Sequence, residues 1–329
     1  MQILKRDLDK PISFKEKMSN FVQNLRNNIQ NIPLDDDELT DLLLSACRVN
    51  DFEVISYQGK KMFLNEDRVL SWLKEKILPN TVVLKLNDED IIRLLIFCIE
   101  ITYQMFSGGT KAAVTAKGFR ERKRTFEAIL VDQFVGKLGE VVIKKFLEKR
   151  FPVKIKLDWE ISRQIDRYRN DIINAKKKVS IKSTPNLAGI WAEADIGYEY
   201  GIMVKCSIPH AVILQFFIEV CGFSRLVDFA EEKIPSDDNL FKGYLAEIRK
   251  RIGHYKCGEI QTDLKGIVCG YFKTRKCLLK PKGVKLEYLG EVREERYLLK
   301  IKDLKWKEKD WEKFLKEIEL LQISPISFG

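Results

Sequence analysis

The sequence predicts a mixed fold of helices and strands, an α/β (α+β) protein with a mainly helical N-terminal region. Apolar residues recur at helical spacing through most of the first hundred residues and again between residues 126 and 151, whereas the segments beyond read as strands. The chain has 329 residues, of which 45% are hydrophobic and 32% charged, which is the usage of globular proteins. This length predicts about two domains. We place their boundary near Ser107-Gly108-Gly109 and predict domains of residues 1–110 and 111–329.

The N-terminal region reads as helix, hairpin, helix. Asp36-Asp37-Glu38 is typical of an acidic helix start. Residues 52–57 and 62–64 read as two short strands around a turn that contains Gly59, and Asn65 follows as the cap of the next helix. This order is compatible with a small winged-helix-like unit that contacts DNA. A helical cap with one surface hairpin is an equally supported interpretation.

The second region begins with a helix over residues 126–151 and continues mainly as strands. Residues 153–157 alternate apolar and basic side chains, as a strand with one buried face does. Residues 170–174 and 177–182 are predicted to form a hairpin, and residues 211–220 read as a central strand covered on both faces. Further strands are predicted over residues 266–272, 284–289 and 297–301. The final helix carries an apolar stripe that we assign to the core, made of Trp311, Phe314, Leu315 and Ile318.

Charge and composition narrow the range of functions. The formal net charge is +10 and the isoelectric point is about 9.1, which favours a polyanionic partner. Two histidines exclude a multi-histidine metal site, and the seven cysteines lack C-x-x-C spacing, which indicates reduced buried thiols. Nucleotide-binding glycine loops are absent. Because no apolar run reaches the length of a membrane span, we expect a cytoplasmic protein.

The predicted hairpin gathers polar side chains. If Ala175 and Lys176 form a two-residue turn, Asp171 lies opposite Ser180 and Lys182 is its diagonal neighbour. Alternation along the second strand then directs its apolar residues to the core and its polar ones to a shared patch. A carboxylate can hold Mg²⁺ there and a lysine can contact a phosphate, which are the requirements of phosphodiester hydrolysis.

An acid on the long helix in Gly136-Lys137-Leu138-Gly139-Glu140, then Asp171, then Ser180-Ile181-Lys182 resembles the pattern of PD-(D/E)xK nucleases. Within that superfamily the chain is most similar to type II restriction endonucleases. The resemblance implies a restriction-endonuclease-like core, a mixed sheet flanked by helices, and Mg²⁺-dependent cleavage of double-stranded DNA. It implies that Asp171 and Glu140 bind the metal and that Lys182 polarises the attacking water and the phosphate. It also implies a homodimer acting on a palindrome and a cognate DNA methyltransferase in the same system.

The sequence departs from this pattern at the second acid, where Ser180 stands in place of Asp or Glu. Some restriction enzymes of the superfamily resemble this case and carry a compensating Glu later in the chain. We take Glu193 as the first candidate for that catalytic and metal-binding role, with Asp195 and Glu219 as alternatives.

Several of these residues have ordinary structural interpretations as well. Glu140 could form a helix-face ion pair with Lys137 or Lys144, but two glycines on the same helix indicate that something approaches its backbone closely. Candidate contacts to DNA are polar, aromatic or basic residues near the pattern, namely Arg120, Arg122, Lys123, Arg124, Ser180, Tyr198 and Tyr200.

These features predict a Mg²⁺-dependent, site-specific deoxyribonuclease of the type II restriction class. The alternatives are another PD-(D/E)xK nuclease, from repair, resolution or a mobile element, and a catalytically inactive DNA-binding protein.

Overall fold

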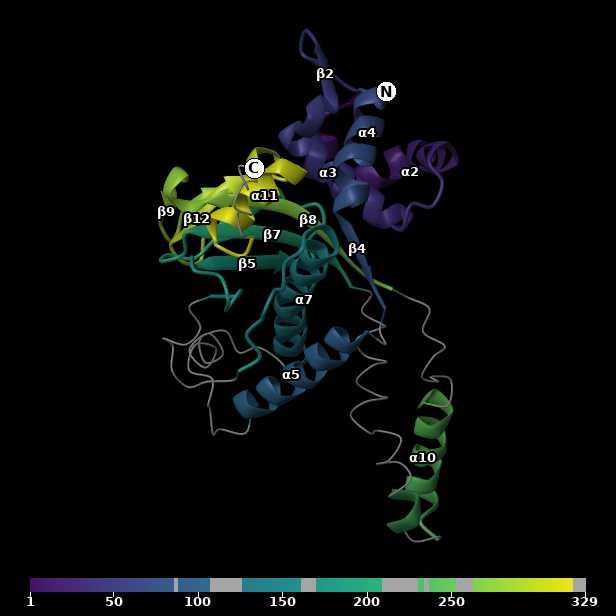
Figure 1. The fold of residues 1–329 in the computed structure, drawn as a ribbon. Helices are drawn as coiled ribbons and strands as arrows, with labels where there is room; N and C mark the ends of the chain where they lie inside the picture. Colours follow the sequence, from purple (N-terminus) through teal and green to yellow (C-terminus); the bar gives the residue numbers. More distant parts are fainter. Residues whose placement is uncertain are drawn as a thin grey trace. The chain divides into compact units, whose positions relative to one another are not determined.

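The computed structural model describes residues 1–85, 88–106, 126–160, 170–208, 230–233, 237–252 and 263–321. The chain divides into two compact units, one of residues 1–207 and 265–329 and the other of residues 208–264. The larger unit combines helices with several sheets, so the predicted mixed α+β class is confirmed (Figure 1). The predicted domain boundary at residue 110 lies outside the described residues.

The elements alternate irregularly along the chain. The helices of the described residues are α1 (Lys5–Asp9), α2 (Pro11–Asn28), α3 (Asp36–Val49), α4 (Glu66–Trp72), α5 (Glu89–Phe106), α7 (Phe126–Arg150), α10 (Asn239–Ile252) and α11 (Glu308–Glu317). The strands are β1 (Gln2–Ile3), β2 (Ile55–Gln58), β3 (Lys61–Leu64), β4 (Thr81–Leu84), β5 (Val179–Thr184), β6 (Trp191–Ala194), β7 (Tyr200–Ser207), β8 (Leu264–Lys273), β9 (Leu279–Lys280), β10 (Lys285–Leu286), β11 (Gly290–Glu291) and β12 (Arg296–Lys300).

The predicted helix start near Asp36 is confirmed. The Asp35 side chain caps α3 by accepting a hydrogen bond from the Glu38 backbone N–H at 2.8 Å, and Glu38 returns the interaction to the Asp35 N–H. This reciprocal cap satisfies two N–H groups that a helix leaves free, and the acidic first turn complements the helix dipole.

The predicted hairpin and the helix after it are also confirmed, except that Asp51–Glu53 form a 3-10 helix and the first strand begins only at Ile55. Strands β2 and β3 pair antiparallel around Gly59, whose φ of +59° suits glycine, and Asn65 caps α4. Strand β1 adds to β3, which gives the order β1-β3-β2. Helix α3 is mostly buried and begins with acids, so it does not present a basic face to a DNA groove. DNA contact by the N-terminal region therefore stays a prediction.

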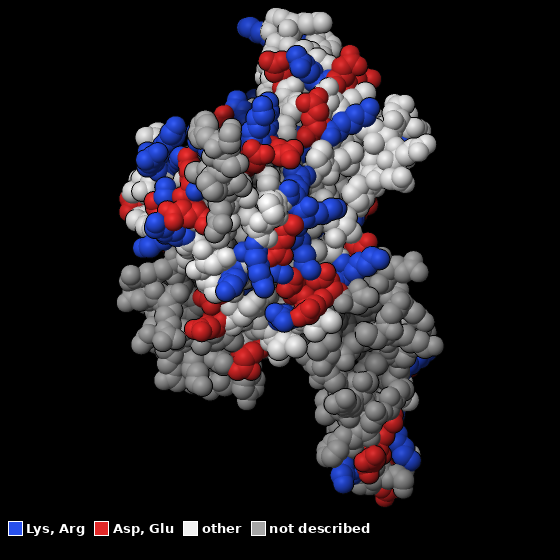
Figure 2. All heavy atoms as spheres, viewed as in Figure 1, with Lys and Arg blue, Asp and Glu red and all other residues white. Residues whose placement is uncertain are grey.

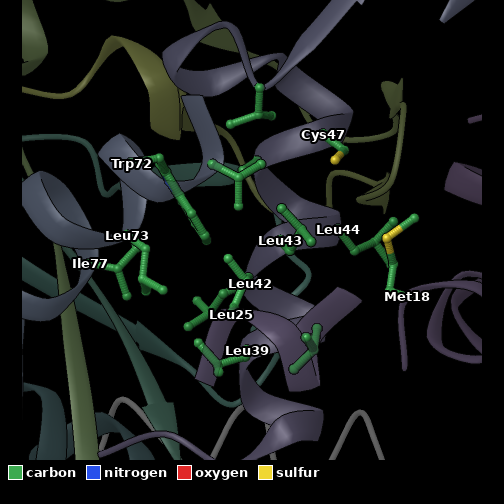
Figure 3. Close-up of a cluster of buried hydrophobic side chains, with 14 of the residues drawn as sticks. Met18, Leu25, Leu39, Leu42, Leu43, Leu44, Cys47, Trp72, Leu73 and Ile77 are labelled. Atoms are coloured by element: carbon green, nitrogen blue, oxygen red, sulfur yellow. The ribbon is translucent and has the colours of Figure 1, made fainter. Parts of the chain in front are cut away.

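The N-terminal helices share one apolar core with the rest of the larger unit. Figure 3 shows side chains of α2, α3 and the α4 region converging in this core, including Met18, Leu43 and Trp72. Leu187 and Ile267, the latter on β8, belong to the same cluster. Burying this surface away from water therefore holds the N-terminal helices against the main sheet.

The main sheet has the strand order β4-β8-β7-β5. Strands β5 and β7 are parallel, with Lys182 beside Met203, and β7 and β8 are antiparallel. Helix α7 packs against β5 and β7 (Figure 1). The predicted strand at residues 266–272 is confirmed within β8. The closing helix is confirmed as well, because its four predicted core residues are fully buried.

Other predicted strands are absent or shorter than predicted. Residues 153–157 and 170–174 contribute only an isolated bridge between Leu157 and Ile172, although Ile155 and Leu157 are buried as predicted. Only Lys285–Leu286 of the predicted strand 284–289 is extended and paired. The predicted strand at residues 211–220 lies outside the described residues.

The described cysteines are free thiols, with Cys47, Cys98, Cys206 and Cys269 buried and Cys277 half-buried. Within the described part of the chain, every helix is too short or too polar to cross a membrane.

Candidate active site on α7 and β5

A glycine lets α7 lie directly on β5. A Cβ atom added at Gly139 would come within 2.5 Å of the Ser183 Cβ, so any larger residue would force the helix and strand apart. The Ser183 hydroxyl donates a hydrogen bond of 2.6 Å to the Val135 carbonyl, which fixes this approach. The prediction of a close approach is confirmed at Gly139, whereas Gly136 has open space around it. The contact places Glu140, the next residue, beside the polar end of β5.

Glu140 is largely enclosed, with 13% of its side chain exposed. Its Oε2 lies 2.7 Å from the Lys137 Nζ. Burial, and then the negative field of Asp171, raise the pKa of the Glu140 carboxyl to about 8, against the opposing effect of Lys137. The helix-face ion pair considered from the sequence therefore exists, but it is buried rather than solvated.

Lys137 is itself tightly held. Its Nζ also donates to the Asp158 carbonyl and lies 5.0 Å from the centre of the Phe97 ring and 5.1 Å from that of Trp159. Cation–π contact of this kind stabilises an ammonium group that has lost water. The second cation of the site is thus supplied from α7.

Asp171 lies beside β5 without forming a strand. Its backbone N–H donates to the Val179 carbonyl at 3.1 Å, and its Oδ2 accepts from the Ile181 N–H at 2.6 Å. Burial raises the pKa of the Asp171 carboxyl, and the Ile181 N–H and the nearby lysines only partly oppose this. The regular hairpin predicted here is wrong, but the predicted placement of Asp171 next to the Ser-x-Lys segment is confirmed.

Lys182 projects from β5 toward solvent. Its Nζ lies 2.5 Å from the Asp195 Oδ2, and these two side chains are 29% and 40% exposed. As predicted, the alternate residues Val179 and Ile181 are buried. Lys182 is therefore accessible from outside while its carboxylate partner orients it.

Tyr198 completes this group. Burial, followed by the negative fields of Asp171, Asp195 and Glu140, raises the pKa of its phenol. We call Lys137, Glu140, Asp171, Lys182, Asp195 and Tyr198 the α7–β5 cluster.

Glu193 belongs to a neighbouring ion pair rather than to this cluster. It sits on β6, and its Oε2 is 2.6 Å from a terminal nitrogen of Arg296 on β12. Of the acids proposed to replace the one missing at Ser180, the structure brings Asp195 to Lys182 and pairs Glu193 with an arginine. The role of Glu193 as a metal ligand stays a prediction.

The remaining predicted contacts divide into two groups. Tyr200 is buried and donates to the Glu317 carboxylate at 2.5 Å, and Ser180 is buried too, so neither presents its side chain to a large ligand. Outside the described residues lie Glu219 and the basic cluster of Arg120, Arg122, Lys123 and Arg124.

The cluster fits a single hard cation. Mg²⁺ is commonly held by one or two carboxylates together with water and substrate oxygens, and Glu140 with Asp171 supplies such a pair. Burial and the negative field of Asp171 raise the pKa of Glu140, and the positive charge of a divalent cation would favour the ionised carboxylates instead. Among the described residues, no three His, Cys, Asp or Glu side chains are grouped to hold a metal, so water and phosphate would provide the other ligands.

Sequence reasoning missed Lys137 as a cation of the site and ranked Asp195 behind Glu193. Neighbouring residues in the sequence do not reveal these roles, because they depend on distant parts of the chain. Phe97 and Trp159 contact Lys137, and Arg296 pairs with Glu193. No family model, curated protein or solved structure matches this chain.

Proposed function

We propose that this protein is a Mg²⁺-dependent, site-specific deoxyribonuclease acting on double-stranded DNA, of the type II restriction class and with a PD-(D/E)xK-like core. One observation carries the proposal: Glu140, Asp171 and Lys182, which come from three separate segments, meet in one cluster that is open to solvent at Lys182. Two enclosed carboxylates beside an accessible lysine are suited to a metal ion and a phosphate.

Each residue has a distinct task in the proposed reaction. Asp171 and Glu140 hold the cation, which supplies Lewis acidity toward the phosphate and the attacking water. Lys182 contacts the phosphate and stabilises the negative charge that develops on it. Asp195 orients the Lys182 ammonium until the phosphate arrives.

The charge of the chain is compatible with a nucleic-acid partner but does not define the contact surface. The net charge of +10 favours a polyanion. Figure 2 shows Lys and Arg interspersed with Asp and Glu over the described part of the visible face. We therefore base the proposal on the cluster rather than on a basic patch. Homodimerisation on a palindromic site and a protecting DNA methyltransferase belong to the same proposal.

The second candidate is an inactive DNA-binding protein. Ser180 is buried where the PD-(D/E)xK pattern has an acid, and Lys182 is paired with Asp195. This candidate predicts binding without metal-dependent cleavage.

Digestion of phage DNA with Mg²⁺ or with EDTA tests the proposal. We expect discrete fragments from the wild type with Mg²⁺ only, and at least a 100-fold loss of rate in Lys182→Ala, because charge stabilisation of a transition state is worth that much. The matched control is Lys178→Ala, an exposed lysine before β5, which should cleave normally. Thermal melting must show that both variants are folded.

The outcomes separate the candidates. Binding of intact DNA without cleavage favours the inactive DNA-binding protein. Metal-dependent cleavage without a defined site favours a repair, resolution or mobile-element nuclease. Cleavage that survives Lys182→Ala contradicts the assignment of the site.

A further inference from the structure

A cavity of about 340 Å³ lies beside the candidate active site and has no role in the proposed chemistry. Its walls come from β6, from β12, and from β11 with the residues on either side of it. The lining residues are Glu193, Leu289, Glu291, Val292, Arg293 and Arg296. Its size is at the lower end of small-molecule sites. Two arginines and two glutamates therefore face one space that could hold a planar ring.

Several of these polar groups are not satisfied by the protein. Arg296 pairs with Glu193 at 2.6 Å and with Glu294 at 3.3 Å, yet its buried Nε–H finds no acceptor among the described residues. Arg293 and Glu291 are exposed and form no ion pair with any other described side chain. The Arg296 Nε is sealed from solvent, so the exposed donor of the cavity is the Arg293 guanidinium and the exposed acceptor is Glu291. The cavity thus offers both a donor and an acceptor.

The cavity is close to the proposed point of cleavage. Glu193 and Asp195 are two residues apart on one extended segment, which spans about 7 Å. Asp195 in turn contacts Lys182 at 2.5 Å. The cavity and Lys182 therefore lie close enough to contact the same short stretch of DNA.

The balance of charges distinguishes between DNA components. Arg293 and Arg296 are matched by Glu193 and Glu291, so a phosphate would gain no net attraction from the four groups. The edge of a guanine·cytosine pair, by contrast, presents acceptors that arginine binds and an amino group that a carboxylate accepts.

We propose that this cavity reads one guanine·cytosine base pair of the DNA substrate, with Arg293 as donor to guanine, Glu291 as acceptor from cytosine and Arg296 holding Glu193 in the wall of the cavity. The inference rests on the proposed function, since it assigns a specificity element to the same site. Lys182 and the carboxylates carry out the cleavage, and the cavity selects where it occurs.

The test is to digest a library of randomised duplexes with Mg²⁺ and to sequence the cut ends. The variants are Arg293→Gln and Glu291→Gln, both at exposed side chains without ion pairs, so that folding is preserved. The matched control is Arg275→Gln, an exposed arginine outside the cavity that removes the same charge. Binding to the library without metal is measured in parallel.

We expect both cavity variants to lose about tenfold in preference at one base position while the other positions are unchanged, as for a direct base contact. Arg275→Gln should keep the wild-type preference. An unchanged preference with uniformly weaker binding and a smaller salt dependence would show a phosphate contact instead and overturn the inference. Unchanged binding and preference would overturn it as well. Absence of any binding or cleavage by the wild type would overturn the proposed function itself.

Discussion

Two groups of charged residues in the larger unit differ in how far they are open to solvent. The first, which we call the enclosed cluster, consists of Asp51, Lys76 and Lys205. The Lys76–Asp51 pair is 2.6 Å long with side chains 5% and 8% exposed, and Lys205 donates to the Ser45 hydroxyl and the Leu187 carbonyl. The neighbouring cavity of about 20 Å³ has room for about one water. This cluster is closed and internally satisfied.

The α7–β5 cluster is different in each respect. Burial raises the pKa of Glu140 and of Asp171, with a further contribution from Asp171 to Glu140, and Lys182 with Asp195 opens to solvent. Burial of charge is common to both clusters and therefore does not identify a functional site. Carboxylates beside an opening are a better indicator, because a cation and a substrate can reach them.

The largest expected effect concerns the enclosed cluster. Asp51→Ala removes the counter-charge of Lys76 and should lower the free energy of unfolding by about 3 to 5 kcal/mol, the cost of leaving a buried charge unpaired. Urea denaturation measures this loss. Asp171→Asn, in the open cluster, should cost much less while abolishing cleavage. Equal losses of stability would contradict the distinction between the two clusters.

A smaller effect is the pH dependence contributed by Lys205. Burial lowers the pKa of this ammonium from 10.5 to about 8. Between these pH values the unfolded chain binds a proton that the folded chain has lost, so stability rises with pH across this window. Relative to Lys205→Met, the wild type should gain on the order of 2 kcal/mol between pH 8 and 10.5. Parallel stability curves for the two proteins would contradict this assignment.

The pH dependence contributed by Glu140 has the opposite sign. The pKa of Glu140 is raised from 4.5 to about 8, so the folded chain keeps a proton that the unfolded chain has lost between these values. Its contribution to stability therefore falls as pH rises through that window. The stability of the wild type should fall relative to that of Glu140→Gln between pH 5 and pH 8.5 in EDTA, because the wild-type carboxyl must then carry its charge in a buried site. Melting temperatures at both pH values measure this, and Mg²⁺ should reduce the difference.

Local signals in the sequence determined much of the fold. The acidic start of α3, the Asn65 cap of α4, the strand within β8 and the stripe of α11 depend on residues that are close in the chain. Gly139 predicted a close contact because glycine destabilises the interior of a helix, and the absence of a side chain is useful where another segment packs against the backbone. The order of Glu140, Asp171 and Lys182 likewise located the candidate site.

The tertiary structure decided which groups meet. Asp171 contacts β5 through side-chain and backbone hydrogen bonds rather than as part of a paired strand. Counting residues outward from the predicted turn therefore gave the right neighbours for Asp171 but predicted a strand that does not form. The pairing of Lys182 with Asp195, and of Glu193 with Arg296, depends on how β5, β6 and β12 come together. Spacing along the chain determines propensity and periodicity, whereas contacts between distant segments depend on how the whole core packs.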